Sequence, residues 1–483
     1  MFADEMNFDK LHEECGVFGI YDHPDSAAHT ALGLHALQHR GQEAAGIVTF
    51  DNDLFYTHRA SGHVGDNFNS REVIESLPGD CGIGHVRYST SGEKHVRNIQ
   101  PLFAEFTFGG LAIAHNGNLT NAAALRKSLI STGAIFQSTM DSEIFIHLIA
   151  TSKFKKVADR VVDALKQVEG AYSLVALTQK KLIGARDPLG VRPLVLGRIG
   201  KSYIFASETC ALDIIGAEYI RDVEPGELII IDKDGLQSSK PFAPTKSRFC
   251  VFEYVYFARP DSYVEGKHVY QVRKNIGAEL ARESHIKGDV VVPVPDSGVP
   301  AALGYAEASG IPFELGIIRN HYVGRTFIEP SDQVRHLGVK LKHNANSSVL
   351  KGKDVILVDD SIVRGTTSKK IVNMVRDAGA KSVHMRIASP PTTDPCFYGV
   401  DTPDKEKLIA ANNSVEEIAK IIGVDSLAFV SIDGLYRAAG EASRNSGAPQ
   451  FCDACFTGDY PISIKECSGE AKTAPLFKEG KRK

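Results

Sequence analysis

The 483-residue sequence contains no block of like charge and no long apolar run. Its formal net charge is −4, which excludes the basic face of a nucleic-acid-binding protein and a polybasic membrane patch. Apolar stretches such as residues 144–150 fall far short of the roughly 20 residues that a membrane-spanning helix needs. Residues 1–14 carry five acidic side chains and lack the apolar centre of a signal peptide. We therefore expect a cytoplasmic protein that binds neither nucleic acid nor a membrane.

Internal repeats, low-complexity tracts and a disulfide scaffold are also missing. The eight cysteines belong to a long chain expected in the cytoplasm, where thiols stay reduced. Only Cys452 and Cys455 are close enough in sequence to form a local pair. Their CxxC spacing alone is compatible with a zinc site, a redox pair or chance. The length indicates two or more ordinary globular domains.

The first half reads as short apolar strands separated by glycine-containing turns, with two helical stretches. We expect strands at residues 16–21, 46–50, 82–86, 112–115, 172–177 and 194–197, and helices at 28–39 and 141–152. This pattern predicts an α+β domain. The polar segment 238–247, with two prolines and no periodicity, is the expected linker.

Beyond residue 260, short runs rich in β-branched residues alternate with helical stretches. We expect strands at 289–293, 313–318, 354–358 and 381–387, and a helix at 368–378. Such alternation predicts an α/β domain with a doubly wound parallel sheet. Its ligands are expected beyond the carboxyl ends of the strands.

The segment 355–369 (VILVDDSIVRGTTSK) carries the strongest local signal for chemistry. A buried strand would deliver Asp359 and Asp360 to the carboxyl edge of the sheet, where they suit ribose hydroxyls and hydrated Mg²⁺. A turn at Gly365 then presents backbone N–H groups at a helix N-terminus, which favours a dianionic phosphate. The turn adds hydroxyl donors and one positive charge, from Ser361, Thr366, Thr367 and Arg364.

An ordinary loop whose acids cap the next helix is the alternative, although two acids ahead of a Gly-Thr turn are unusual for a cap. A Walker A loop is excluded, because the lysine that it requires is missing. The segment closely resembles the loop of the type I phosphoribosyltransferases. The resemblance implies that phosphoribosyl pyrophosphate binds Asp359, Asp360, Ser361, Ile362, Val363, Arg364, Gly365, Thr366 and Thr367.

A second strand end, at residues 290–305, resembles the matching pyrophosphate loop of that family. Small residues there let the backbone approach an anion closely. Mg²⁺ near Asp359, Asp360 and Ser297 would neutralise the departing pyrophosphate as a Lewis acid.

Four motifs in the first half resemble the class II glutamine amidotransferases, which are N-terminal nucleophile hydrolases with an αββα sandwich. They are EECGVFGI (13–20), GHVRYST (84–90), HNGNLTN (115–121) and STMDSE (138–143). In that family the leader, here residues 1–14, is removed, so that Cys15 becomes the first residue. Its free α-amine, with a pKa near 8, then serves as the base for its own thiol.

The same resemblance assigns roles to six residues. Cys15 attacks the glutamine carboxamide, and the Asn116 side chain and Gly117 N–H form the oxyanion hole. Arg87 holds the α-carboxylate and Asp141 the α-ammonium. Thr90 is a further glutamine-binding candidate. Taken singly, HNG would be only a hairpin turn, and Arg87 or Asp141 a surface ion-pair partner.

The two halves in this order resemble the glutamine phosphoribosylpyrophosphate amidotransferases. The implied organisation is a propeptide (1–14), a glutaminase domain (15–245), a phosphoribosyltransferase domain (250–450) and a C-terminal cluster-ligating segment with a tail (451–483). The resemblance implies that ammonia from glutamine passes through an internal, dry channel to C1 of the ribose. It also implies feedback binding of purine nucleotides and a homotetramer.

Cys250, Cys396, Cys452 and Cys455 lie in contexts that match the branch of this family carrying a [4Fe–4S] cluster. On geometry alone four thiolates would hold zinc equally well. The resemblance favours iron–sulfur, with a structural role. It further implies that the polar segment 320–342 closes over the phosphoribosyl substrate, the alternative being a plain surface loop.

Two other functions are alternatives to amidotransfer onto phosphoribosyl pyrophosphate: another enzyme with the same glutaminase half, or a regulator. Asparagine synthetases and hexosamine synthases share the glutaminase half, but neither an ATP pyrophosphatase loop nor a sugar-isomerase half is found. A regulator that only senses phosphoribosyl pyrophosphate would need neither Cys15 nor the HNG motif.

Overall fold

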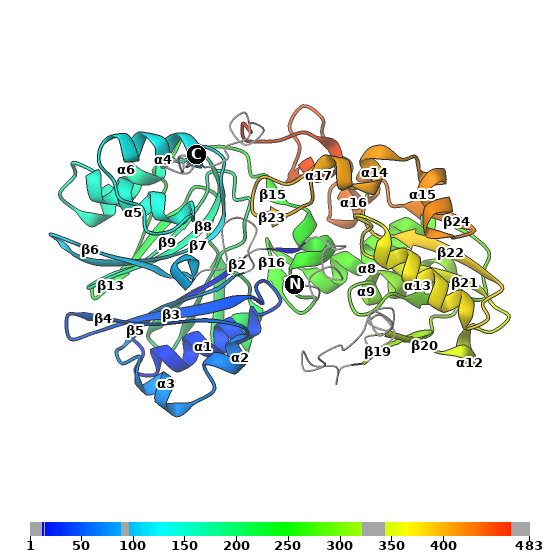
Figure 1. The fold of residues 1–483 in the computed structure, drawn as a ribbon, viewed down its shortest axis with the longest axis horizontal. Helices are drawn as coiled ribbons and strands as arrows, with labels where there is room; N and C mark the ends of the chain where they lie inside the picture. The colour runs from blue at the N-terminus through cyan, green and yellow to red at the C-terminus, as the bar shows by residue number, and fades with distance from the viewer. Residues whose placement is uncertain (1–11, 14, 88–95, 321–342, 465–483) are drawn as a thin grey trace, which may run out of the picture.

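The computed structural model describes residues 12–13, 15–87, 96–320 and 343–464. Most of the leader, Thr90, nearly all of the loop predicted at 320–342 and the C-terminal tail lie outside these residues. Two domains lie side by side, connected by the segment at 240–248 (Figure 1). No helix in the described part of the chain is long and apolar enough to cross a membrane.

The N-terminal domain contains two antiparallel sheets between two layers of helices (Figure 1). The seven-stranded sheet has the order β12 (Glu218–Asp222), β10 (Val195–Ile199), β11 (Ser202–Ala206), β2 (Cys15–Tyr21), β5 (Cys81–Arg87), β3 (Ala44–Asp51) and β4 (Leu54–Ser61). The six-stranded sheet has the order β14 (Gly235–Ser239), β13 (Leu228–Asp232), β9 (Leu182–Arg186), β8 (Gly170–Thr178), β7 (Gly109–Leu119) and β6 (Leu102–Phe106). The helices α1 (Ser26–Ala36), α2 (Val64–Asn67) and α3 (Arg71–Glu75) lie on one side, and α4 (Ala122–Ser131), α5 (Ser142–Thr151) and α6 (Val157–Leu165) on the other. The short helix α7 (Cys210–Asp213) packs with α1.

Alternating side chains explain why these strands form two stacked sheets. In β2, Val17 packs between the sheets, whereas Phe18 and Ile20 face α1. In β7, Ala112 lies between the sheets and Ile113 packs with the α5 side. Successive strand residues point to opposite faces, so each strand contributes to an inner and an outer core. The predicted αββα sandwich is confirmed.

The C-terminal domain is organised around a four-stranded parallel sheet with the order β18 (Val290–Pro293), β21 (Asp354–Asp359), β22 (Ser382–Ile387) and β24 (Ser426–Phe429). Its larger helices are α8 (Val269–Glu283), α9 (Val299–Ser309), α13 (Thr366–Asp377), α15 (Val415–Ile422) and α16 (Ile432–Ala438). In β21, Ile356 packs with α8 and α9, while Val355 and Leu357 pack with α13 and α15. Both faces are therefore covered, which confirms the predicted parallel α/β architecture.

Short elements complete the described chain. They are β1 (His12–Glu13), η1 (Val96–Asn98), β15 (Phe249–Cys250), η2 (Glu253–Phe257), β16 (Tyr263–Val264), β17 (Lys267–His268), β19 (Ile317–Arg319), β20 (His343–Ala345), α12 (Ser347–Leu350), β23 (Val400–Asp401), η3 (Lys405–Lys407), α14 (Ile409–Asn412), β25 (Phe451–Cys452) and α17 (Ala454–Thr457). Two pairings join distant parts of the sequence: β1 with β23, and β15 with β25.

Two local expectations need correction, and one alternative reading is excluded. The continuous strand at 313–318 is wrong, since Phe313 makes only an isolated bridge to Val291 and the chain leaves the sheet before β19. Leu315 and Ile318 are nearly half exposed, so these apolar residues do not mark a buried strand. The expected linker starts too early, because β14 extends to Ser239. The HNG residues lie inside β7 and do not form a hairpin turn.

Candidate active sites

Cys15 lies at the start of β2, directly opposite Arg87 in the ladder with β5. Both side chains are buried. Alternate residues of a strand share a face, so Cys15 lies on the same face as Val17, which packs between the sheets. Arg87 likewise shares its face with His85, which contacts the main chain of β7. The structure therefore brings the predicted nucleophile and the predicted carboxylate-binding residue together between the two sheets.

Asn116 and Gly117 come from β7 in the facing sheet. Asn116 is fully buried and shares its face with Ala112 and Ala114, which line the space between the sheets. Gly117 has φ 140°, and a Cβ there would lie 2.0 Å from the carbonyl oxygen of Ala171. Only glycine fits this position, so the backbone that carries the predicted oxyanion N–H tolerates no side chain.

Asp141 immediately precedes α5 and is fixed to the end of β7. Its Oδ2 accepts the backbone N–H of Leu119 at 2.9 Å. The following residue, Ser142, has its Oγ 3.1 Å from Nδ1 of His115. The loop before α5 is thus tied to the strand that carries Asn116 and Gly117. Thr90, the sixth predicted residue, lies outside the described residues.

Two residues near this site were not predicted, His85 and Gln100. Nε2 of His85 donates to the carbonyl oxygen of His115 at 3.2 Å, and Oε1 of Gln100 accepts the His115 N–H at 2.8 Å. Burial lowers the pKa of His85 to about 3, so the ring is neutral and carries its proton on Nε2. Both main-chain groups preceding Asn116 are therefore held by side chains. The sequence signals for His85 were its place in the GHVRYST motif and its core-facing strand position, and neither indicated its partner.

The predicted phosphate loop begins where β21 ends. Asp359 and Asp360 are buried, and the backbone N–H of Asp360 donates to Oδ1 of Asp359 at 2.9 Å. Gly365, with φ 81°, precedes α13, so backbone N–H groups at that helix N-terminus follow the turn. Ile362 and Val363 pack into the two cores on opposite faces of the sheet. Only their main chain is available to a ligand.

The two predicted substrate loops of the C-terminal domain meet at Asp360. Its Oδ1 accepts from Oγ of Ser297 at 2.5 Å, and its Oδ2 from Oγ of Ser361 at 2.7 Å. These carboxylate and hydroxyl oxygens are hard donors that suit Mg²⁺. Arg273, which was not predicted, is a buried cation; burial lowers its pKa to about 10, and Asp360 is the strongest opposing charge.

Comparisons with known proteins identify the two halves. Residues 85–213 match the glutamine amidotransferase domain family, and residues 261–389 match the phosphoribosyl transferase domain family. The amidophosphoribosyltransferase of Rhizobium etli is 61% identical over 474 residues, covering 97% of this chain and 96% of the relative. The Bacillus subtilis amidophosphoribosyltransferase is 49% identical over 455 residues, covering 94% and 95%. The chain belongs to the amidophosphoribosyltransferase family.

A solved structure supports the assignment at the level of the fold. The glutamine phosphoribosylpyrophosphate amidotransferase of B. subtilis, complexed with ADP and GMP, superposes with a TM-score of 0.88 at 48% identity. The match covers 93% of this chain and 98% of that chain. Both domains and their order are therefore those of the amidophosphoribosyltransferases.

The four cysteines predicted to bind a cluster lie close together where the two domains meet. Cys250 and Cys452 are opposite each other in the parallel pair β15–β25, and Cys455 follows in α17. The thiol of Cys396 accepts the backbone N–H of Tyr398 at 3.3 Å. Burial raises the pKa of Cys452 to about 12, and the Cys396 thiol contributes to that shift. Burial and then Cys250, Cys396 and Cys452 raise the pKa of Cys455 well above its ordinary value. Four closely placed thiols fit a metal centre that would stabilise their thiolate forms.

A buried ion network joins the two domains next to these cysteines. Nη2 of Arg40 lies 2.7 Å from Oε2 of Glu253, and Nη1 of Arg192 lies 3.2 Å from Oε1 of the same carboxylate. Arg40 also pairs with Glu208, whose Oε2 accepts the backbone N–H of Arg259 at 2.8 Å. Burial alone would raise the pKa of Glu208, but Arg40 and then His39 lower it below its ordinary range. All four charges of the Arg40–Arg192 network are fully buried and paired.

Proposed function

We propose that the N-terminal domain hydrolyses glutamine and that the C-terminal domain uses the ammonia to aminate phosphoribosyl pyrophosphate. Glutamine, phosphoribosyl pyrophosphate and water give glutamate, 5-phosphoribosylamine and pyrophosphate, the first step of purine (IMP) biosynthesis. One observation carries this proposal: both candidate sites are present on a single chain. That chain matches an amidophosphoribosyltransferase over 97% of its length. Cys15 faces Arg87 in one domain, and paired acids end a parallel strand in the other.

For the glutaminase reaction, we infer that removal of residues 1–14 frees the α-amine of Cys15. That amine takes the thiol proton, and the sulfur attacks the carboxamide carbon to form a thioester and release ammonia. Water then cleaves the thioester to glutamate. The Asn116 side chain and Gly117 N–H stabilise the oxyanion. Arg87, Asp141 and Thr90 bind the amino-acid end of glutamine.

For the transfer reaction, the loop at 359–367 binds phosphoribosyl pyrophosphate through its main-chain N–H groups and hydroxyls. Asp359, Asp360 and Ser297 would hold Mg²⁺, which neutralises charge on the departing pyrophosphate when bound. Neutral ammonia attacks C1, because ammonium has no free electron pair. The Arg40–Glu253–Arg192 network supports an internal route, since these fully buried charges hold the two domains against each other.

We propose that Cys250, Cys396, Cys452 and Cys455 hold a [4Fe–4S] cluster with a structural role. Tetrahedral zinc with Zn–S bonds of about 2.3 Å requires thiolates roughly 3.8 Å apart. Among the described residues, the only group of three or more metal-ligating side chains whose ligand atoms all lie within 4.8 Å is His23, Asp25 and His29. No three of the four thiols approach that closely, which favours a larger cluster over a single ion. Iron and sulfide analysis of anaerobically purified protein distinguishes the two, with stoichiometric zinc and no sulfide excluding the cluster.

Regulation and assembly are proposed by analogy with the relative. The B. subtilis structure contains ADP and GMP, which supports feedback binding of purine nucleotides by this chain. We also propose a homotetramer. Inhibition assays with purine nucleotides and light scattering on the purified protein test these two points.

The nucleophile assignment is tested with Cys15→Ala. Glutamine-dependent synthesis should be abolished, whereas synthesis from high ammonia at alkaline pH should persist. Cys81→Ala is the matched control, because Cys81 is a buried thiol of the same sheet whose pKa burial raises to about 12. Glutamine-dependent activity in Cys15→Ala would refute the assignment. Intact-mass measurement of the active wild type should show a chain beginning at Cys15.

A further inference from the structure

A segment of the C-terminal domain lies directly against the strand that carries the proposed oxyanion hole. It runs from Cys396 to β23. Nδ2 of Asn118 donates to the carbonyl oxygen of Phe397 at 2.9 Å. A Cβ built on Gly399 would lie 2.9 Å from Cα and 3.0 Å from the carbonyl carbon of Gly117. The backbones of Gly399 and Gly117 are therefore in contact across the domain boundary.

Gly399 is itself fixed in place. Its φ is 102°, and its carbonyl oxygen accepts Nη2 of Arg192 at 2.6 Å. Nη1 of Arg192 pairs with Glu253 in the interdomain ion network. On its other side, Gly117 approaches Ala171 too closely for any side chain. The main chain at Gly117 therefore lies between its own sheet and a tethered glycine of the other domain.

We propose that Gly399 is a positioning residue for the glutaminase reaction. Building on the proposed function, its backbone fixes the peptide that presents the Gly117 N–H to the developing oxyanion. The oxyanion hole is then complete only when the C-terminal domain is docked. Glutamine hydrolysis thereby depends on the presence of the domain that consumes its ammonia. The role is positional, because Gly399 touches Gly117 and not the reacting atoms.

Gly399→Ala tests this proposal by pushing a methyl group against Gly117. Loss of an oxyanion donor typically costs about 100- to 1,000-fold in kcat, so we expect glutamine-dependent kcat to fall by at least about 10-fold. The KM for glutamine should change less than about threefold, because Arg87 and Asp141 are untouched. Ammonia-dependent synthesis should stay within about twofold of wild type.

Two control variants separate contact with Gly117 from backbone strain at positive φ. Gly216 and Gly423 have φ 67° and 82°, and a Cβ at either meets no heavy atom within 4 Å. Gly216→Ala and Gly423→Ala should keep both activities. Asn118→Ala removes the tether to Phe397 without adding bulk, and should lower glutamine-dependent kcat in the same selective way.

Two results would overturn the positioning role. One is an unchanged glutamine-dependent kcat in Gly399→Ala. The other is a parallel loss of glutamine- and ammonia-dependent activity in both Gly399→Ala and Asn118→Ala, which would indicate a general folding defect. Failure of the proposed function is distinct, since it would appear as a wild-type enzyme without glutamine-dependent synthesis.

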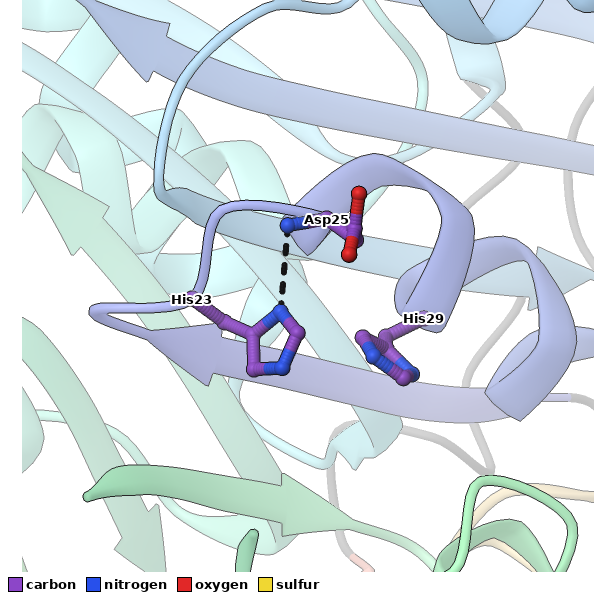
Figure 2. Close-up of side chains that lie close together, drawn as sticks. All are labelled: His23, Asp25 and His29. Carbon is purple, nitrogen blue, oxygen red and sulfur yellow. Dashed lines mark hydrogen bonds between the residues drawn. The ribbon is translucent and has the colours of Figure 1, made fainter. Parts of the chain in front are cut away.

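A second, independent inference concerns the turn between β2 and α1, at the end of β2 remote from Cys15. The ligand atoms of His23, Asp25 and His29 all lie within 4.8 Å of one another (Figure 2). Asp25 and His29 are four residues apart at the start of α1, so they share one helix face. We infer that this trio forms a binding site for a divalent transition-metal ion such as Zn²⁺.

The surroundings leave the donors available. Asp25 occupies the N-cap position but its carboxylate makes no capping hydrogen bond, and Nδ1 of His29 is buried without a hydrogen-bond partner. Nδ1 of His23 accepts the backbone N–H of Asp25 at 3.1 Å (Figure 2). A metal competes with this bond, so we expect weaker binding than at a structural zinc site.

Titration of the cluster-loaded full chain with Co²⁺ tests this site. With the proposed site at Asp359, Asp360 and Ser297 saturated by Mg²⁺, we expect one equivalent with d–d bands and no added thiolate charge-transfer absorption, displaced by Zn²⁺. The equivalent should disappear in His29→Leu and in Asp25→Asn, and persist in His35→Gln, a change of an exposed histidine on the same helix. Equal binding by His29→Leu, or thiolate bands in the titration, would overturn the assignment.

Discussion

The two catalytic sites proposed for this chain are constructed in opposite ways. The phosphoribosyl site is assembled mainly from one continuous segment, in which a strand ends at Asp359 and a helix begins at Thr366. The proposed glutaminase site is assembled from Cys15, Arg87 and Asn116, which lie on three strands of two sheets. The first site is a local structure that its own sequence dictates. The second exists only after two sheets have packed and, by our inference, after the other domain has docked.

The contrast is most strongly tested by Asp360→Asn. Both nitrogen sources use the same phosphoribosyl electrophile, so glutamine- and ammonia-dependent synthesis should both fall about 1,000-fold. Asp354→Asn, at the partly buried start of the same strand and remote from its carboxyl end, is the control and should keep both activities. Steady-state assays with each nitrogen source provide the measurement. Retention of either activity in Asp360→Asn would break the contrast.

The next largest effect is expected at the domain interface. Glu253→Gln leaves Arg40 and Arg192 buried without their shared countercharge, which should cost about 3–5 kcal/mol of stability. Glutamate should then form in excess over phosphoribosylamine, because the two domains are no longer held in a fixed position relative to each other. Denaturant unfolding and the ratio of the two products measure these effects.

Glu218→Gln is the matched control for that change. Its pair with Arg198 is exposed, and exposed pairs contribute at most about 1 kcal/mol. A Glu253→Gln enzyme with wild-type stability and a 1:1 product ratio would show that the network does not couple the sites.

Arg87→Met should affect only the proposed glutaminase site, whose residues come from three strands of two sheets. Losing a charged hydrogen bond to the glutamine carboxylate costs about 1.5–3 kcal/mol, or roughly 10- to 100-fold in kcat/KM for glutamine. Ammonia-dependent synthesis should be unchanged. Arg71→Met, which removes an exposed arginine of α3, should alter neither activity. If Arg87→Met lowered both activities equally, the two sites would not be separable as described.

The same contrast explains what the sequence could and could not predict. The strands leading to Pro293 and Asp359 are short apolar runs buried on both faces, so composition alone identifies them. The run at 313–318 has a similar composition, but Leu315 is exposed and the chain turns away after one bridge. Tertiary contacts, which composition does not encode, decided the outcome there.

Site residues follow the same rule. Asp359 and Asp360 were accessible to physical reasoning, because their chemistry and position lie in one segment. Cys15 and Asn116 became significant only through family resemblance. His85 and Arg273 were missed, since the partners that give them meaning, the His115 carbonyl and Asp360, lie 30 and 87 residues away. The local sequence around a residue does not indicate which distant residue it will contact, so the roles of His85 and Arg273 could not be predicted from it.

The smallest expected effect is on the pH dependence of folding stability. It tests directly whether His85 supports the main chain of His115. The folded-state pKa of His85 is about 3, below the ordinary value of 6.5. Between these two values the unfolded chain binds a proton that the folded chain excludes, so stability falls as pH is lowered from 6.5 toward 3. At pH 5 the loss from this residue is about 2 kcal/mol relative to pH 7, at roughly 1.4 kcal/mol per pH unit.

His85→Gln keeps a donor for the His115 carbonyl but cannot be protonated, so its unfolding midpoint in urea should shift less between pH 7 and pH 5 than that of wild type. His35→Gln, which changes an exposed histidine of α1, should leave the wild-type shift intact. Identical shifts in all three proteins would mean that His85 is charged or solvated in the folded state. In that case the neutral bridge between the sheets would not exist. In the proposed glutaminase site, Gln100 alone would then hold the main chain before Asn116.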